Sequence, residues 1–315
     1  MNPSRTSGFT HALGNWLGTA EVFDGKGRFL GNATDRRHVT EVVGENRVRI
    51  ELSFVGPLKF AGHYFIEDHK THRLYQGPAN VGYAETLATN LIDANAYWAI
   101  TGLTQRFFLM IAPDGNSQIS LGLMSRGDDL MYVIVGEYHR VGEYHRIPEG
   151  QTVAGIPALV NGTHYDLQDD PLAGRDAHYL LRDGKWTGTL HTLDGDLNEL
   201  PDTSYVEEVE RNGIGPRNSY LSVSVRGTAF DDQPRIMKVR SNNWQFWSEP
   251  GDLVGSGSMS GGRALSGHFH HLPANLRVWR REVVTHDGTQ KAVVHTWYRG
   301  GQRVGVQFGI LKFET

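Results

Sequence analysis

The chain has 315 residues, of which 39% are hydrophobic, enough for one large or two ordinary domain cores. Its 31 basic and 35 acidic residues give a net charge of −4, which does not favour a nucleic-acid partner or an anionic membrane surface. The sequence has no cysteine, which excludes disulfides, thiolate metal sites and a cysteine nucleophile. The N-terminus is not followed by an apolar signal region, and the longest aliphatic run, 131–135, is too short to span a bilayer, so we expect a cytoplasmic protein with no membrane partner.

The first half of the chain has mainly strand patterns. Residues 9–13 are compatible with a helical turn that leads into Trp16. Between residues 47 and 54, apolar and polar residues alternate with a period of two, which predicts a half-buried strand. Further segments with strand patterns cover 63–67, 73–76, 107–111, 119–124 and 130–136. Short strands separated by Gly, Asp and Asn clusters are typical of an antiparallel barrel or sandwich.

Three segments in and just after the first half do not have a simple strand pattern. Tyr83, Leu87 and Leu91 recur every four residues, so 82–94 is interpreted as a helix or an ordered loop over the barrel mouth. The hexapeptide at 135–140 is repeated at 141–146 and is interpreted as a locally extended strand. The Pro-, Gly- and Asp-rich composition of 147–176 predicts a linker.

The second half repeats the strand pattern. Its expected strands cover 221–226, 235–239, 243–247, 276–284, 291–298 and 304–313. The glycine-rich stretch 255–261 lacks the spacing of a dinucleotide fingerprint, the lysine of a P-loop and the serine of a nucleophile elbow. We therefore expect it to be a flexible loop at the barrel mouth.

The two halves are related by an internal repeat. Gly14-Asn15-Trp16-Leu17-Gly18-Thr19 returns as Gly184-Lys185-Trp186-Thr187-Gly188-Thr189, an offset of 170 that becomes 173 further along the chain. Such a slowly drifting offset indicates a tandem duplication. The sequence therefore predicts an all-β chain of two tandem antiparallel barrels, at 1–146 and 177–315, in which Trp16 and Trp186 plug corresponding core positions.

These residues carry a family resemblance. Gly14-x-Trp16 and Gly184-x-Trp186, each followed by an antiparallel meander, resemble the lipocalin-like (calycin) superfamily, in which such a tryptophan closes one end of the barrel. Two fused barrels also resemble the carotenoid hydratase-like proteins and lipocalin-like natural-product cyclases, although no catalytic motif of those enzymes can be carried over. The resemblance implies a barrel interior that holds a lipophilic molecule. Some lipocalin-like barrels bind haem through one histidine, so haem stays an alternative.

Histidines supply the candidate acid–base groups. His268 and His270 share one face of an expected strand, next to the glycine-rich stretch, and are the leading catalytic candidates, with His63 as competitor. Arg280 is a candidate for stabilising an oxyanion or phenolate, and Tyr298 for donating a hydroxyl proton, if both face inward. A surface or structural role for each histidine is the alternative interpretation.

Five aromatic residues are candidates for contacting the ligand: Tyr83, Tyr97, Trp98, Trp247 and Trp297. His63, His69 and His72 span an expected turn with no carboxylate tied to them by spacing, so no metal site is expected.

Three classes of function stay open. The first is a cofactor-independent lyase, isomerase or cyclase that acts by general acid–base chemistry on a bulky hydrophobic or aromatic molecule. The second is a non-catalytic intracellular binder or carrier of such a molecule, and the third is haem or metal binding. We lead with the enzyme and expect no cofactor; homo-oligomerisation is compatible with the sequence.

Overall fold

The computed structural model describes residues 11–69, 71–142, 179–211, 219–226, 230, 235–241, 245–248 and 251–315. Residues 9 and 10 of the expected helical turn, residues 143–146 of the hexapeptide repeat and the expected linker 147–176 lie outside this range. No helix among the described residues is long and apolar enough to cross a membrane.

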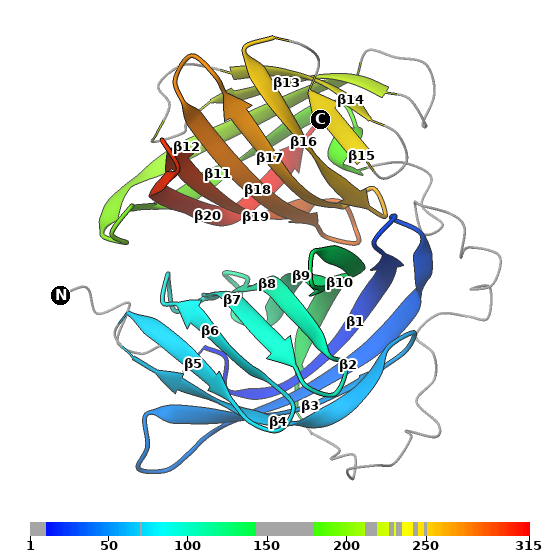
Figure 1. Cartoon of the computed structure of the whole chain (residues 1–315), viewed down its shortest axis with the longest axis vertical. Coiled ribbons are helices and arrows are strands. Elements are labelled where there is room, and N and C mark those ends of the chain that lie inside the picture. The colour runs from blue at the N-terminus through cyan, green and yellow to red at the C-terminus, as the bar shows by residue number, and fades with distance from the viewer. Residues whose placement is uncertain are drawn as a thin grey trace. The chain divides into compact units, whose positions relative to one another are not determined.

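The chain divides into two compact units, Met1–Asp169 and Asp170–Thr315. Each unit contains one closed barrel of ten antiparallel strands (Figure 1). The predicted all-β class with two tandem antiparallel barrels is therefore confirmed.

The first barrel is a simple meander, in which each strand pairs with the next and β1 closes the sheet by pairing with β10. Its strands are β1 (Gly14–Asp24), β2 (Phe29–Glu41), β3 (Arg47–Val55), β4 (Lys59–Asp68), β5 (His72–Gln76), β6 (Val81–Glu85), β7 (Leu91–Trp98), β8 (Leu103–Ile111), β9 (Ser117–Arg126) and β10 (Asp129–Val141).

The second barrel has the same order and closes between β11 and β20, and a short 3-10 helix, η2 (Tyr179–Leu181), precedes it. Its strands are β11 (Gly184–Asp194), β12 (Glu199–Arg211), β13 (Ser219–Arg226), β14 (Arg235–Ser241), β15 (Gln245–Ser248), β16 (Leu253–Ser260), β17 (Ala264–His271), β18 (Leu276–Val284), β19 (Gln290–Arg299) and β20 (Gln302–Glu314).

The repeat in the sequence is also a repeat in strand register. Gly18 lies opposite Asp35, and Gly188 lies opposite Tyr205, which keeps the offset of 170 on both strands. Phe107 lies opposite Gly122, and their counterparts at an offset of 173, Arg280 and His295, are also paired. Equivalent positions of the two barrels can therefore be compared residue by residue.

The two repeated tryptophans are core residues, as the sequence predicts. Trp16 and Trp186 are 1% and 0% exposed and belong to the hydrophobic clusters of their own barrels. The Trp16 indole N–H donates to the Ala12 carbonyl oxygen at 2.9 Å, and the Arg140 guanidinium lies 4.4 Å from the Trp16 ring centroid. The guanidinium of Arg182 lies 5.3 Å from the Trp186 ring centroid.

The prediction of a helix or loop over 82–94 is wrong, because β6 and β7 account for most of this stretch. Tyr83 lies on β6, Leu91 lies on β7 and Leu87 lies in the loop between them, so their spacing of four does not follow a single element. The stretch 255–261 is likewise a strand, β16, for nearly all of its length. A Cβ at Gly257 would lie 2.4 Å from the Phe246 ring, so this glycine provides room for an aromatic core residue.

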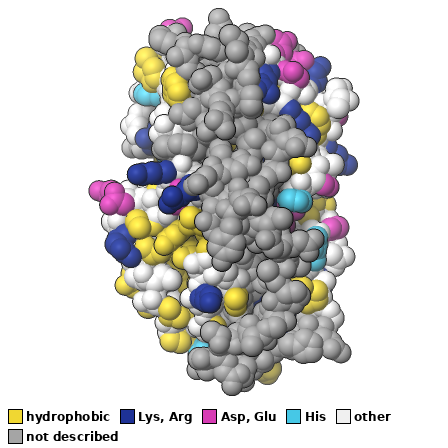
Figure 2. Space-filling model, turned by 90° about the vertical axis from the view of Figure 1, so that its right-hand side faces the viewer, with side chains coloured by type: hydrophobic (Ala, Val, Ile, Leu, Met, Phe, Trp, Pro, Cys, Tyr) yellow, Lys and Arg dark blue, Asp and Glu magenta, His cyan; other side chains and the backbone are white. Residues whose placement is uncertain are grey.

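Basic, acidic and hydrophobic side chains are intermixed over the described part of the face shown in Figure 2. This distribution agrees with the small net charge of −4.

Candidate functional site

The interior of the first barrel contains a cavity of about 50 Å³. Aromatic rings form part of its wall: Phe54 and Phe60 are stacked with centroids 4.9 Å apart, and Phe60 lies 5.0 Å from Trp98. The residues that line the cavity come from β2, β3, β4 and β7 to β10 and are Asp35, Arg37, Leu52, Phe54, Phe60, Tyr64, Trp98, Gln105, Phe107, Leu109, Ser120, Leu121, Gly122, Ile134 and Tyr138.

The polar side of the cavity begins on β2. Ala33 and Val39 on this strand belong to the core, and Asp35 and Arg37 lie between them on the same inward face. An Asp and an Arg therefore occupy positions where the alternation of the strand would place apolar residues. Buried charges need partners, and here the charges pair with each other.

Tyr138 joins this pair from β10. The phenol packs where the neighbouring strand β1 carries a glycine, since a Cβ at Gly18 would lie 2.1 Å from the Tyr138 ring. The Arg37 Nη2 donates to Asp35 Oδ2 at 2.7 Å and to the Tyr138 hydroxyl at 2.8 Å, and that hydroxyl donates to Asp35 Oδ2 at 3.0 Å. Arg37 and Tyr138 thus both donate to one oxygen of Asp35.

The other oxygen of Asp35 is different. Asp35 is 3% exposed, and its Oδ1 is fully buried with no hydrogen-bond partner. A buried acceptor left unpaired is unfavourable by about 1–3 kcal/mol, more when it is charged. This oxygen is therefore able to accept a hydrogen bond from a molecule in the cavity that Asp35 lines.

Burial and the ion pair fix the protonation of the neighbouring groups. Burial alone would lower the pKa of Arg37, but the Asp35 carboxylate outweighs this effect, so the pKa is raised and Arg37 stays charged. Burial raises the pKa of Tyr64 to about 12, and it also raises the pKa of Tyr138 against the opposing effect of Arg37. At neutral pH both phenols keep their protons.

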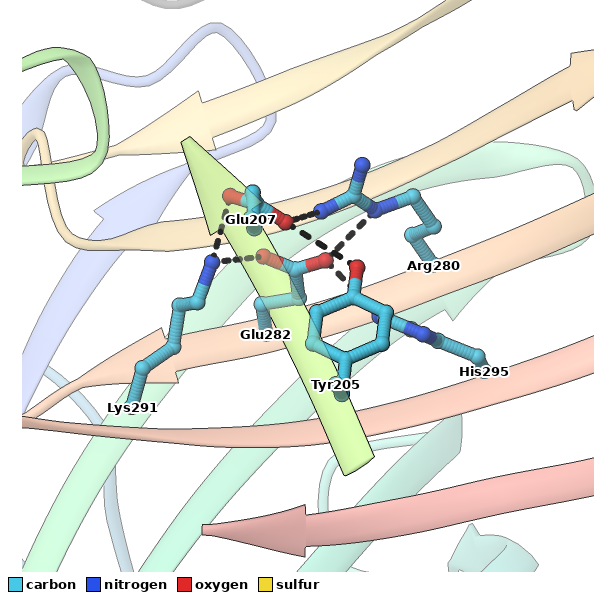
Figure 3. A network of polar contacts seen from close by, with 6 residues as sticks. All are labelled: Tyr205, Glu207, Arg280, Glu282, Lys291 and His295. Atoms are coloured by element: carbon cyan, nitrogen blue, oxygen red, sulfur yellow. Dashed lines mark hydrogen bonds and ion pairs between the residues drawn. The ribbon is translucent and has the colours of Figure 1, made fainter. Parts of the chain in front are cut away.

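The interior of the second barrel holds a network of buried ionisable groups (Figure 3). Its members are Tyr205 and Glu207 on β12, Arg280 and Glu282 on β18, and Lys291 and His295 on β19. Figure 3 shows the two carboxylates lying between the lysine and the arginine. Two anions are matched by two cations, so the network carries no net charge when the histidine is neutral.

The contacts in this network are short and numerous. Lys291 Nζ lies 2.7 Å from Glu207 Oε1 and 3.1 Å from Glu282 Oε2. Arg280 pairs with Glu207 and, at 2.6 Å, with Glu282 Oε1. His295 Nε2 lies 2.9 Å from Glu282 Oε1, and the Tyr205 hydroxyl donates to Glu207 Oε2 at 3.2 Å.

The network shifts the acidity of its members. Burial alone would raise the pKa of Glu207 and Glu282, but Arg280 and then Lys291 outweigh it, so both values are lowered. Burial lowers the pKa of His295 despite the opposing effect of Glu282, which favours the neutral imidazole. The two acids are therefore ionised at neutral pH.

The two barrels differ at equivalent positions. At an offset of 170, Asp35 corresponds to Tyr205 and Arg37 to Glu207; at an offset of 173, Phe107 corresponds to Arg280 and Leu109 to Glu282. Side chains that form apolar wall in the first barrel are thus replaced by ions in the second. In the duplicated fold, the first barrel has a cavity with a polar corner formed by Asp35, Arg37 and Tyr138, and the second barrel has a charge-balanced network.

The leading histidine candidates do not face a barrel interior. On β17, Phe269 is buried in the core and lies opposite Val278, so His268 and His270 project from the outer face. His268 is exposed and its ring is stacked on Trp279 with centroids 5.4 Å apart. Burial, with Arg277 and Arg281, lowers the pKa of His268. The expectation that these two histidines could point into a cavity is wrong, because the alternation of the strand assigns the inward face to Phe269.

The other catalytic candidates, Tyr298, His63 and Arg280, are not brought together at one site either. Tyr298 lies on the outer face beneath Arg277, whose guanidinium is 4.4 Å from the ring centroid. His63 and Phe65 lie on the outer face of β4, and their rings are 5.9 Å apart. Arg280 does face inward, as its proposed role requires, but its contacts are those of the ion network.

Of the five aromatic ligand candidates, Trp98 lines the cavity of the first barrel, and its indole N–H donates to Gln105 Oε1 at 2.6 Å. Tyr83 and Tyr97 are 45% and 44% exposed and line an open depression of about 570 Å³ on the outside of that barrel. Trp297 is buried in the core of the second barrel, and Trp247 is half-buried on β15.

Sequence reasoning did not identify the residues that form the polar corner, Asp35, Arg37 and Tyr138. The available signal was the alternation of Phe29, Ala33 and Val39, which continues through Asp35 and Arg37. Within the described ranges, no group of three or more His, Asp or Glu side chains is placed to hold a metal ion.

No protein-family model matches the chain, and no curated protein matches its sequence. Among solved structures, the chain is similar to a protein of unknown function from the DUF3598 family of Nostoc punctiforme PCC 73102, with a TM-score of 0.59, 12% identity and 100% of each chain covered. At this identity the similarity shows the fold alone.

Two further structural neighbours are more distant. An S-type phycobiliprotein lyase from Guillardia theta has a TM-score of 0.33 and 10% identity, over 43% of this chain and 92% of that chain. Kievitone hydratase from Nectria haematococca has a TM-score of 0.20 and 7% identity, over 100% of this chain and 93% of that chain. Because these TM-scores are below 0.5, neither neighbour bears on function. The closed ten-strand barrels fit a calycin-like fold.

Proposed function

We propose that the first barrel binds a small lipophilic or aromatic molecule in its interior cavity. The observation that carries this proposal is the unpartnered Oδ1 of Asp35, a buried charged group on the wall of a cavity that is otherwise largely aromatic and aliphatic. Ligand sites usually combine an apolar wall with a few placed polar groups. The sequence resemblance to carotenoid hydratase-like proteins and lipocalin-like cyclases supports the same class of ligand.

This proposal moves the site from the second barrel to the first. The histidines that favoured the second barrel lie on an outer face, and equivalent interior positions of that barrel are occupied by the ion network. In the first barrel, the corresponding positions carry Phe107 and Leu109, which line the cavity.

The size of the cavity restricts what enters without rearrangement. Its volume of about 50 Å³ is roughly a third of the ~150 Å³ that accommodates a benzene ring in an engineered cavity. Phe60 lines the cavity and is only half-buried, near the start of β4, which makes it the side chain best placed to move aside. A bulky ligand therefore requires displacement of Phe60, whereas a small one does not.

A titration with benzene tests the proposal, with the indole N–H resonance of Trp98 as a local reporter. Phe60→Ala should enlarge the cavity and bind benzene, and adding Ile134→Phe to this variant should fill the cavity and abolish the shift of this resonance. Adding Leu276→Phe instead places a similar extra volume in the core of the second barrel and should leave binding unchanged. If Phe60→Ala shows no binding, or its Ile134→Phe derivative binds as well as Phe60→Ala itself, the proposed site is wrong.

A cofactor-independent lyase, isomerase or cyclase is the second candidate function. A carboxylate held through one oxygen by Arg37 and Tyr138, with the other oxygen unpartnered, is a positioned general base. With a small carbon acid that also carries a hydroxyl, such as hydroxyacetone, Asp35 Oδ1 would take a proton from carbon while the electron pair moves to the carbonyl oxygen, which the hydroxyl of Tyr64 on the cavity wall can stabilise. The Asp35 carboxyl proton then exchanges with water, and Asp35 returns a proton or a deuteron to the carbon.

Solvent-deuterium incorporation into hydroxyacetone, followed by NMR, measures this exchange directly. Asp35→Asn should lower the rate by about 10²–10⁴-fold if Asp35 is the base. Exchange that does not exceed the buffer rate would leave the binding function and remove the catalytic one for carbon acids of this size.

A further inference from the structure

We infer that the cavity of the first barrel selects ligands that carry an N–H or O–H donor and directs this donor to Asp35 Oδ1. This inference rests on the proposed binding function and specifies the chemistry of its ligand. The first-barrel cavity is thus assigned a polarity: it accepts a hydrogen bond from the ligand and disfavours a ligand whose polar end is itself an acceptor or an anion.

The hydrogen bonds around Asp35 establish this polarity. Arg37 donates to Oδ2 from Nε at 3.1 Å and from Nη2 at 2.7 Å, and the Tyr138 hydroxyl donates to the same atom at 3.0 Å. These donors all converge on Oδ2. Oδ1 receives none of them and is the fully buried side-chain atom of this cavity without a hydrogen-bond partner.

Two polar groups near this corner already have partners. The Gln105 Oε1 already accepts from the Trp98 indole at 2.6 Å, and the Ser120 hydroxyl lies 3.5 Å from the Tyr138 hydroxyl. The charge of Arg37 is paired with Asp35, so an incoming anion would meet a carboxylate oxygen before an uncompensated cation. A donor is the group that lowers the free energy of this corner.

Water is the simplest donor, and about 50 Å³ has room for it, since one water needs roughly 10–15 Å³. A ligand must therefore replace water and supply its hydrogen bond. Displacement by a group that cannot reproduce that bond loses affinity. Donor selectivity then follows from competition with water as well as from direct attraction.

Asp35→Asn should invert the preference. Arg37 and Tyr138 both donate to Oδ2, so the amide oxygen of the variant is held at that position and the amide nitrogen takes the place of Oδ1. An acceptor would then become a donor in a side chain of nearly the same shape. An inversion, rather than a general loss of binding, is the specific signature of the arrangement.

Pyrrole and furan are suitable probes, because these five-membered rings have similar shapes and differ in presenting an N–H donor or an oxygen acceptor. Titrations of the full chain carrying Phe60→Ala, followed at the Trp98 indole resonance, should give about ten- to hundredfold tighter binding of pyrrole than of furan. When Asp35→Asn is added to this variant, furan should bind at least as tightly as pyrrole.

A control variant tests whether the effect is specific to Asp35. Asp93→Asn alters another buried Asp–Arg pair, in which Arg106 Nη2 lies 3.0 Å from the carboxylate, at a residue that does not line the cavity, and should leave the preference intact. Equal binding of pyrrole and furan to Phe60→Ala overturns the inference but leaves the binding function standing. Failure of both probes and of benzene to bind Phe60→Ala overturns both, and the Phe60→Ala measurement is decisive even if the variant that also carries Asp35→Asn does not fold.

Discussion

Lys291 provides a sharp test of the ion network in the second barrel. Its side chain is 0% exposed, and its ammonium lies 2.7 Å from Glu207 and 3.1 Å from Glu282. Replacement by Met keeps most of the side-chain volume but leaves two buried carboxylates with Arg280 as the remaining neighbouring cation. Removing one partner of a buried ionic group typically destabilises by about 3–5 kcal/mol, because an uncompensated charge stays in the interior.

The matched control is Lys185→Met. Lys185 also pairs with a glutamate, Glu208, at 3.4 Å, but the two side chains are 48% and 39% exposed. Exposed pairs contribute about 0–1 kcal/mol, because water and salt screen them. The two substitutions therefore remove the same chemical group from a lysine–glutamate pair in a buried and an exposed setting.

Urea denaturation followed by tryptophan fluorescence measures the difference, with Trp186 as a probe within the second barrel, since its ring centroid lies 5.1 Å from the Lys291 ammonium. With a slope of about 2 kcal/mol per molar urea, Lys291→Met should lower the midpoint by about 1.5–2.5 M and Lys185→Met by less than about 0.5 M. Glu207→Gln in the Lys291→Met background should restore part of the loss by removing the excess charge. Equal midpoints for the two lysine variants would refute the assignment of the network as a coupled buried unit.

Three further outcomes are expected. Trp16→Ala and Trp186→Ala should each destabilise their barrel by about 3–5 kcal/mol, seen as lower denaturation midpoints; midpoints equal to the parent's would contradict the core assignment. The second barrel should lose stability as the pH falls, so denaturation midpoints at about pH 8, 6 and 4 should decrease in that order. Because the pKa of His295 is lowered, its contribution to stability is complete above the ordinary value of 6.5 and declines below it. The pKa values of Glu207 and Glu282 are also lowered, and they add a further loss as the pH falls through their folded-state values. His268→Ala in the Phe60→Ala background should leave pyrrole binding in the first barrel unchanged, and a large loss measured at the Trp98 resonance would restore this histidine as a site candidate.

Much of the architecture is encoded locally. A period of two in segments such as 47–54 specifies a strand wherever it occurs, and the near-constant offset between Trp16 and Trp186 specifies two copies of one unit. Local patterns were weaker where one spacing or composition fits two structures. The spacing of four in 82–94 fits one face of a helix, but it arises across β6, a loop and β7, and the glycines of 255–261 fit a loop as well as a strand packed against aromatic rings.

The sequence alone determined which residues share a strand face, since His268 and His270 must lie on the same side of β17 whatever surrounds them. It did not determine which side is interior, because that depends on the closure of ten strands around a common core. Closure brings Tyr138 of β10 to Asp35 of β2, about a hundred residues earlier, and it brings Glu207 of β12 to Arg280 of β18. The cavity and the ion network therefore belong to the tertiary structure: a buried charge is tolerable only where distant strands supply its partner, and no local pattern records that partner.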